Sequence, residues 1–328
     1  MIDRRSTLRL LAAGTAALAV PALRAQGQPP MLKQVTVVVG FPAGGATDIV
    51  ARLVAEGMRG RYAETAIVEN RPGGSGRVAA QYVKNGPADG SLMLFTPAFP
   101  LAIFPHIYKS LPYDPLQDFV PVATTGKSPM GLSVGPGVPA SVRTLQDFIA
   151  WTKQNPDRAT FGAPLGGGQH FAGVMLAERA GIPLRMVPYK GGAPSVTDVL
   201  GGHIASVITP LAEVLPHVRD GKLRLLATTS ATRTRFTPEV PTLREAGFDV
   251  VFQDWSGLVA PARTPRELVA RANAVVAETL RSAPVAATLE KTGVDVDLNS
   301  PQDFANIYRA AWERYRDVVK KTGFTADE

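Results

Sequence analysis

The sequence has 328 residues, of which 45% are hydrophobic and 19% are charged, with a formal net charge of +7 and no cysteine. This length and apolar content are enough for two hydrophobic cores, so two domains are expected. The lack of cysteine excludes disulfides, thiolate metal sites, cysteine nucleophiles and a lipid-modified N-terminal cysteine.

The first 25 residues have the pattern of an export signal. Arg4 and Arg5 precede an apolar run that ends near Leu23, and the small residue Ala25 precedes a polar stretch. The apolar run is too short to span a bilayer. Residues 4–9 also resemble a twin-arginine signal, which leaves both that route and the general secretory route open. We therefore expect cleavage after Ala25 and a soluble protein in the periplasm.

The positive charge of the chain comes in large part from this segment. Cleavage would lower the net charge from +7 to +4, because it removes four Arg and one Asp. The remainder has no Lys/Arg run and no basic residues interleaved with aromatic ones, the patterns that follow a phosphate backbone. Nucleic acid is therefore not an expected partner.

After residue 31, short β-rich runs alternate with segments of helical period, which is typical of βαβ units. The first unit is a strand at 35–39, a glycine turn at 40–47 and a helix at 48–61. The same order predicts further strands at 65–69, 92–96, 159–163, 185–189, 205–209 and 223–229. Glycine-rich loops follow several of them, and ligands bind at the carboxyl ends of strands in open α/β sheets.

Two extended, glycine-punctuated stretches at 119–136 and 248–261 are expected to cross between two domains. The first domain is discontinuous, with residues 31–126 and 250–328, and ends in helices at 265–283 and 301–321. The second domain spans residues 127–249. The predicted fold is α/β, with two Rossmann-like domains of mainly parallel sheets joined by two crossing segments, and such a double hinge permits closure around a ligand.

The loop at 41–48 is the most informative motif. Gly44 and Gly45 allow positive φ and close backbone approach, while Thr47 or Asp48 can cap the helix that follows. A free helix N-terminus with a glycine nest binds carboxylate or phosphate without a cation, although the loop can also be read as a plain tight turn. Because the glycines do not fit G-x-G-x-x-G, no dinucleotide cofactor is expected.

A second loop, Gly166-Gly167-Gly168-Gln169-His170, opens a helix at 171–180 and repeats this arrangement. Two facing helix N-termini can hold one anion. His170 is expected either to donate to a ligand or to pack and cap at the helix start. In the third loop, at 189–194, Lys190 is expected to be solvated, and Asp198 in the following helix is either a structural partner or a ligand contact.

No local signature of catalysis is present. Ser75 lies in Gly-Gly-Ser-Gly-Arg, which lacks the last glycine of a nucleophile elbow. The four histidines have no metal-ligand spacing, so no metal is expected: His106, His170, His203 and His217. The protein is therefore not expected to be an enzyme; if it were one, His170 and Asp198 would be the acid–base candidates.

Six segments of the mature chain occur in an order that carries a family resemblance: GFPAGGATD (40–48, followed by Ala51-Arg52), ENRPG (69–73), LPYDP (111–115), VPYKGGAP (187–194), PEVPT (238–242) and WSGL (255–258). Together they resemble the Bug-type substrate-binding proteins of the tripartite tricarboxylate transporter system. The resemblance implies a two-lobed periplasmic-binding-protein fold of the type II kind, closure on a small carboxylate, no cofactor, and a two-component membrane permease as partner.

The resemblance also implies that backbone N–H groups and ordered waters hold the ligand carboxylates. Side-chain specificity differs from that of relatives, which commonly have Ser or Thr where this chain has Ala163, Pro164, Gly167 and Gln169. The expected ligand-binding residues are Phe41, Ala43, Gly44, Gly45, Ala46, Thr47, Asp48, Gly166, Gly167, Gly168, Gln169, His170 and Asp198.

The expected function is capture of a mono-, di- or tricarboxylate, aromatic or aliphatic, by a monomeric protein that delivers it to the permease. Two alternatives stay open at this point. One is a ligand sensor for a membrane signalling receptor, and the other is a secreted enzyme on the same two-lobed scaffold.

Overall fold

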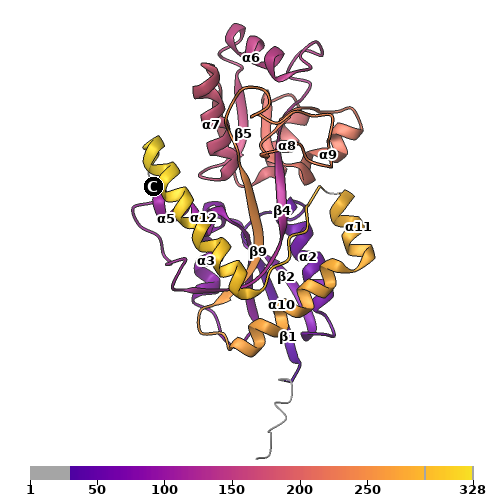
Figure 1. Cartoon of the computed structure of the whole chain (residues 1–328), viewed down its shortest axis with the longest axis vertical. Helices are drawn as coiled ribbons and strands as arrows, with labels where there is room; N and C mark the ends of the chain where they lie inside the picture. Colours follow the sequence, from indigo (N-terminus) through magenta and orange to yellow (C-terminus); the bar gives the residue numbers. More distant parts are fainter. Residues whose placement is uncertain (1–29, 292, 327–328) are drawn as a thin grey trace, which may run out of the picture. The chain divides into compact units, whose positions relative to one another are not determined.

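The computed structural model describes residues 30–291 and 293–326 (Figure 1). The predicted export signal at residues 1–25 lies outside the described residues. The strands are β1 (Leu32–Val39), β2 (Ala63–Asn70), β3 (Leu92–Pro97), β4 (Phe119–Val134), β5 (Thr160–Pro164), β6 (Arg185–Tyr189), β7 (Ser206–Pro210), β8 (Arg224–Thr228) and β9 (Gln253–Pro261).

Helices lie around the strands (Figure 1). They are α2 (Ala46–Met58), α3 (Arg77–Lys84), α4 (Phe99–Ala102), α5 (Phe104–Ile107), α6 (Leu145–Gln154), α7 (Gly168–Ala180), α8 (Gly192–Leu200), α9 (Leu211–Arg219), α10 (Arg266–Arg281), α11 (Ala283–Lys291) and α12 (Pro301–Thr322), with a 3₁₀ turn η1 (Gly74–Gly76).

The described strands form two five-stranded sheets that share β4. The first runs β2-β1-β3-β9-β4, and the second contains β4, β8, β7, β5 and β6. Strands β1, β2 and β3 are parallel, as are β5, β6 and β7, whereas β4, β8 and β9 pair antiparallel. The expected parallel βαβ units are therefore present, and the antiparallel pairs come from the strands that cross between the sheets and from β8 beside them.

The two crossing segments lie side by side. Residues 119–129 of β4 pair with β9, whereas residues 130–134 of the same strand pair with β7 and β8 (Figure 1). Both segments were predicted as extended from their sequence. The assignment of residues 31–126 and 250–328 to one domain and 127–249 to the other stays a prediction.

The C-terminal helices pack against the first sheet. In α12, Phe304 and Tyr308 are buried and meet Trp255 of β9 edge-on, with ring centroids 4.9 and 5.6 Å apart. In α10, the Asn273 side chain donates to the backbone carbonyls of Val122 in β4 and of Asn299, at 2.9 Å each. These contacts fix the crossing strands to the rest of the first sheet.

The predicted strands and helices are all present to within a few residues, but α4, α5, α6, α9 and α11 had no sequence prediction. Helix α9 contains Pro216, which removes a backbone donor inside the helix and obscures its helical pattern. This omission matters because the N-terminal turn of α9 carries Glu213.

Gly173 lets α7 approach β5, since a β-carbon there would collide with the buried ring of Phe161. We expect Gly173→Ala to lower the free energy of unfolding by about 1–3 kcal/mol, although Ala is the better helix former. Urea unfolding checks this. In a Phe161→Leu background the same substitution should cost less, and an equal cost in both backgrounds would contradict the steric explanation.

Candidate functional site

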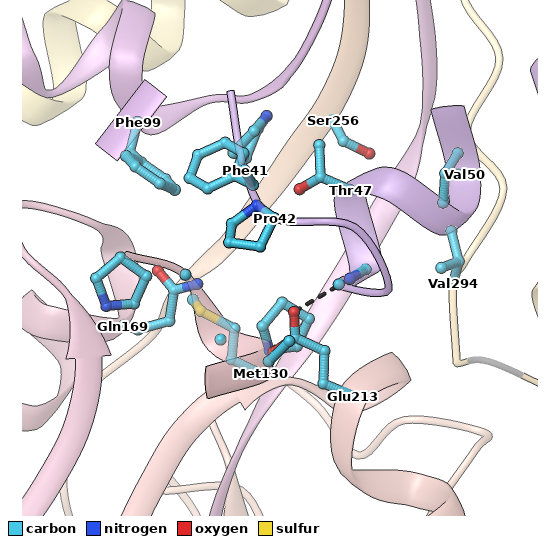
Figure 2. A pocket seen from close by; sticks show the side chains of 18 of the residues that line it. Phe41, Pro42, Thr47, Val50, Phe99, Met130, Gln169, Glu213, Ser256 and Val294 are labelled. Carbon is cyan, nitrogen blue, oxygen red and sulfur yellow. Dashed lines mark hydrogen bonds between the residues drawn. The ribbon is translucent and has the colours of Figure 1, made fainter. Parts of the chain in front are cut away.

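A cavity lies at the carboxyl ends of strands from both sheets, beside the N-termini of α2, α7 and α8 (Figure 2). The space between the atoms is about 830 Å³, which includes open solvent at the mouth. The lining residues are Phe41, Pro42, Gly45, Ala46, Thr47, Val50, Pro97, Phe99, Met130, Pro164, Gln169, Gly191, Gly192, Ala193, Pro210, Glu213, Trp255, Ser256 and Val294.

The two loops singled out in the sequence have the same backbone geometry. Gly45 precedes α2 with φ −77° and ψ 167°, and Gly167 precedes α7 with φ −78° and ψ 165°. The residue before each is a glycine with positive φ, 84° at Gly44 and 72° at Gly166. The first N–H groups of a helix have no intrahelical partner. Neither capping glycine supplies a side-chain acceptor for them.

In both loops the positive-φ glycine donates its N–H to the side chain four residues later. The Gly44 N–H donates to Asp48 Oδ2 at 2.9 Å, and the Gly166 N–H donates to His170 Nδ1 at 3.3 Å. Asp48 and His170 therefore hold the turns in shape. Neither residue is among those that line the cavity.

Asp48 is buried and lies at the centre of a polar network that reaches the surface at Arg52. Its carboxylate accepts from the guanidinium of Arg52 at 2.9 and 3.0 Å and from the Asn70 amide at 2.8 Å, and Asn70 also donates to the Phe41 carbonyl. Burial raises the Asp48 pKa, but the hydrogen bonds from Arg52, Gly44 and Asn70 outweigh it and leave the pKa below its usual value. The first loop is thus braced by an ionised carboxylate behind it.

His170 is buried and neutral. Burial lowers its pKa to about 4, and its ring packs against Phe171 and the C-terminal Phe324, with centroids 5.4 and 4.8 Å away. A buried, hydrogen-bonded imidazole of this kind fits the packing role that the sequence left open for it.

The structure brings five of the sequence-predicted site residues to the cavity: Phe41, Gly45, Ala46, Thr47 and Gln169. The others lie outside the lining: Ala43, Gly44, Asp48, Gly166, Gly167, Gly168, His170 and Asp198. Asp198 accepts a hydrogen bond from the Tyr189 hydroxyl at 2.6 Å. Whether any of these residues contacts a ligand stays a prediction.

Several lining residues had no site prediction. Phe99, Met130 and Trp255 form apolar walls, and Gly191, Gly192 and Ala193 bring the start of α8 to the cavity. A β-carbon on Gly191 would lie 3.4 Å from Pro42 Cδ, so this third loop touches the first one. In the sequence, the glycine pair after β6 could have identified this third loop as part of the site. The other walls come from segments that are distant in sequence, so no local pattern indicates them.

Among the described residues that line the cavity, Glu213 has the one ionisable side chain, and none of them is Lys, Arg or His. Its Oε1 accepts from the Ala46 N–H at 3.1 Å, at the N-terminus of α2 (Figure 2). Burial raises the Glu213 pKa to about 7, and the Ala46 hydrogen bond opposes this only in part. The Glu213 carboxylate thus occupies part of the place where the sequence predicts a bound anion.

The family described as Tripartite tricarboxylate transporter family receptor matches residues 50–324. BugT of Bordetella pertussis is 32% identical over 294 residues, covering 89% of this chain and 90% of BugT. This chain belongs to that family.

Solved structures agree with the assignment. The periplasmic binding protein BugD has a TM-score of 0.84 at 27% identity, over 90% of this chain and 99% of BugD. An R. palustris protein solved with adipate has a TM-score of 0.82 at 33% identity, over 89% of this chain and 98% of its own. The two-lobed periplasmic-binding-protein fold and the Bug-type resemblance are thereby confirmed.

Among the described residues, no helix is both long and apolar enough to cross a bilayer. Within the same residues, no group of three or more His, Asp or Glu is arranged to hold a metal ion.

Acid stability tests the role of His170. The pKa of His170 is about 4 in the folded protein and near 6.5 in the unfolded chain. The unfolded chain therefore binds a proton first as the pH falls. The free energy of unfolding is unaffected by His170 above pH 6.5 and decreases by roughly 3 kcal/mol as the pH falls toward 4. We expect His170→Asn, which keeps an acceptor for Gly166, to show a shallower loss over this range in urea unfolding. Equal pH slopes for the two proteins would contradict a buried neutral His170.

Proposed function

We propose that this protein is an extracytoplasmic solute-binding protein that captures a small carboxylate between its two lobes and delivers it to a two-component membrane permease. The observation that carries the proposal is the convergence of the helix N-termini of α2, α7 and α8 on one largely apolar cavity. The family and the adipate ligand of a relative support the same chemistry.

The proposed site binds an anion without a positively charged side chain. Unpaired N–H groups at a helix N-terminus and the helix dipole favour a carboxylate. The apolar walls, including Phe41, Phe99 and Trp255, bury the carbon skeleton of the ligand and exclude water. The proposed ligand contacts are therefore the cavity-facing residues of the three loops, with the Asp48 and His170 side chains holding two of the loops behind them.

Release and delivery require the lobes to separate. Because β4 and β9 are the strands that run between the two sheets, we propose that they act as the double hinge. The ligand would stabilise the closed arrangement, which the permease then recognises. Export to the periplasm through the signal at residues 1–25 is part of the same proposal.

The enzyme alternative finds no support at the cavity. It requires His170 and Asp198 as acid and base, but both side chains lie outside the lining and each has a hydrogen-bond partner within the chain. A sensory role would use the same ligand site with a different membrane partner, and no observation favours it.

Ligand binding can be tested by thermal shift with a set of mono- and dicarboxylates. At a concentration of one hundred times its Kd, a ligand that binds only the folded state adds about 2.7 kcal/mol of stability. We expect at least one carboxylate to raise the Tm and Ala193→Leu to abolish that rise, because the larger side chain fills the cavity.

The matched control is Thr197→Leu, an exposed position on the same helix. It should retain the ligand-induced rise in Tm. Should every carboxylate leave the Tm of the wild-type protein unchanged, carboxylate capture would be excluded.

A further inference from the structure

We propose that Glu213 makes the cavity selective for a carboxylate with a single anionic end, so that the ligand is a monocarboxylate with an apolar body. This inference rests on the proposed function and names the substrate class of the same site. It concerns a side chain that had no predicted role in the site.

The first reason is the position of the Glu213 carboxylate. It reaches from α9 to α2, where Oε1 takes the Ala46 N–H at 3.1 Å (Figure 2). It also lies against the start of α8, because a β-carbon on Gly192 would collide with the carboxylate. The Glu213 side chain therefore stands where two helix N-termini meet, the position that favours a bound anion.

The second reason is the lack of compensation for its charge. Oε2 is buried and has no hydrogen-bond partner within residues 30–291 and 293–326. The lining supplies no cationic side chain in that same part of the chain. A second carboxylate brought to this part of the cavity would meet a like charge in a poorly solvated place, where repulsion is strong.

The third reason is the chemistry of the other walls. Phe41, Phe99 and Met130 offer apolar surface, while Thr47, Ser256 and Gln169 bring donor groups to other parts of the cavity (Figure 2). Nε1 of Trp255, another lining residue, is buried without a partner among the described residues. One carboxylate can thus be bound by amides and side-chain donors, and the rest of the ligand meets apolar side chains.

The experiment compares pairs of ligands in which one member carries a second carboxylate at the far end. Hexanoate and adipate form one pair, and benzoate and terephthalate form another. Calorimetry at pH 8, where Glu213 with its pKa of about 7 is ionised, should show the monocarboxylate of a pair binding at least about tenfold more tightly to the wild-type protein. In Glu213→Gln, which keeps the size and removes the charge, this preference should shrink to less than about threefold through a gain in dicarboxylate affinity.

Two further variants secure the interpretation. Glu213→Met also removes the charge, and it should shift the preference in the same direction if Glu213→Gln fails to fold. Glu239→Gln, at an exposed position, should leave the preference unchanged.

The outcomes separate the two proposals. If the wild-type protein binds the dicarboxylates as tightly as the monocarboxylates, or if the preference is the same in the charge-free variants, the selectivity role of Glu213 is overturned while carboxylate capture stands. If no carboxylate binds either the wild-type protein or the variants, both proposals are overturned.

Discussion

The site depends on main-chain N–H groups that its glycine turns leave free. At Gly45 and Gly167 the capping position has no side chain to satisfy the following amides, and the preceding glycine has a backbone conformation that other residues rarely adopt. The first amides of each helix have no intrahelical acceptor, so water, a ligand or another part of the chain can accept from them. At Ala46 the acceptor is Glu213.

The side chains that matter most for shape therefore lie behind the loops. Asp48 and His170 occupy equivalent positions, each accepting from the glycine four residues earlier, but only Asp48 is charged. Asp48 keeps its charge because Arg52 and Asn70 surround it, whereas His170 is neutral in an aromatic environment. The two turns therefore have the same geometry although different side chains hold them. The cavity lining has no positively charged side chain among the described residues.

Much of the fold was predictable from the chain. Apolar runs such as 35–39, followed by glycine loops and helical periods, located the parallel strands and the helices after them. The extended character of 119–136 and 248–261 identified the crossing segments, because both contain glycine and apolar residues without helical period. Helix α9 and its Glu213 had no sequence prediction, because Pro216 interrupts the helical pattern.

The sequence by itself determined the alternation of strands and helices, the two glycine turns and the family, since each is encoded in local residue order. Only the tertiary structure decided which side chains line the cavity. Phe99, Met130, Glu213 and Trp255 lie far apart in sequence and meet there because β4 and β9 bring both sheets to the same place. The environment of a carboxylate is likewise a property of the folded neighbours: Asp48 and Glu213 are both acidic, but one is surrounded by donors and the other is left with a single N–H.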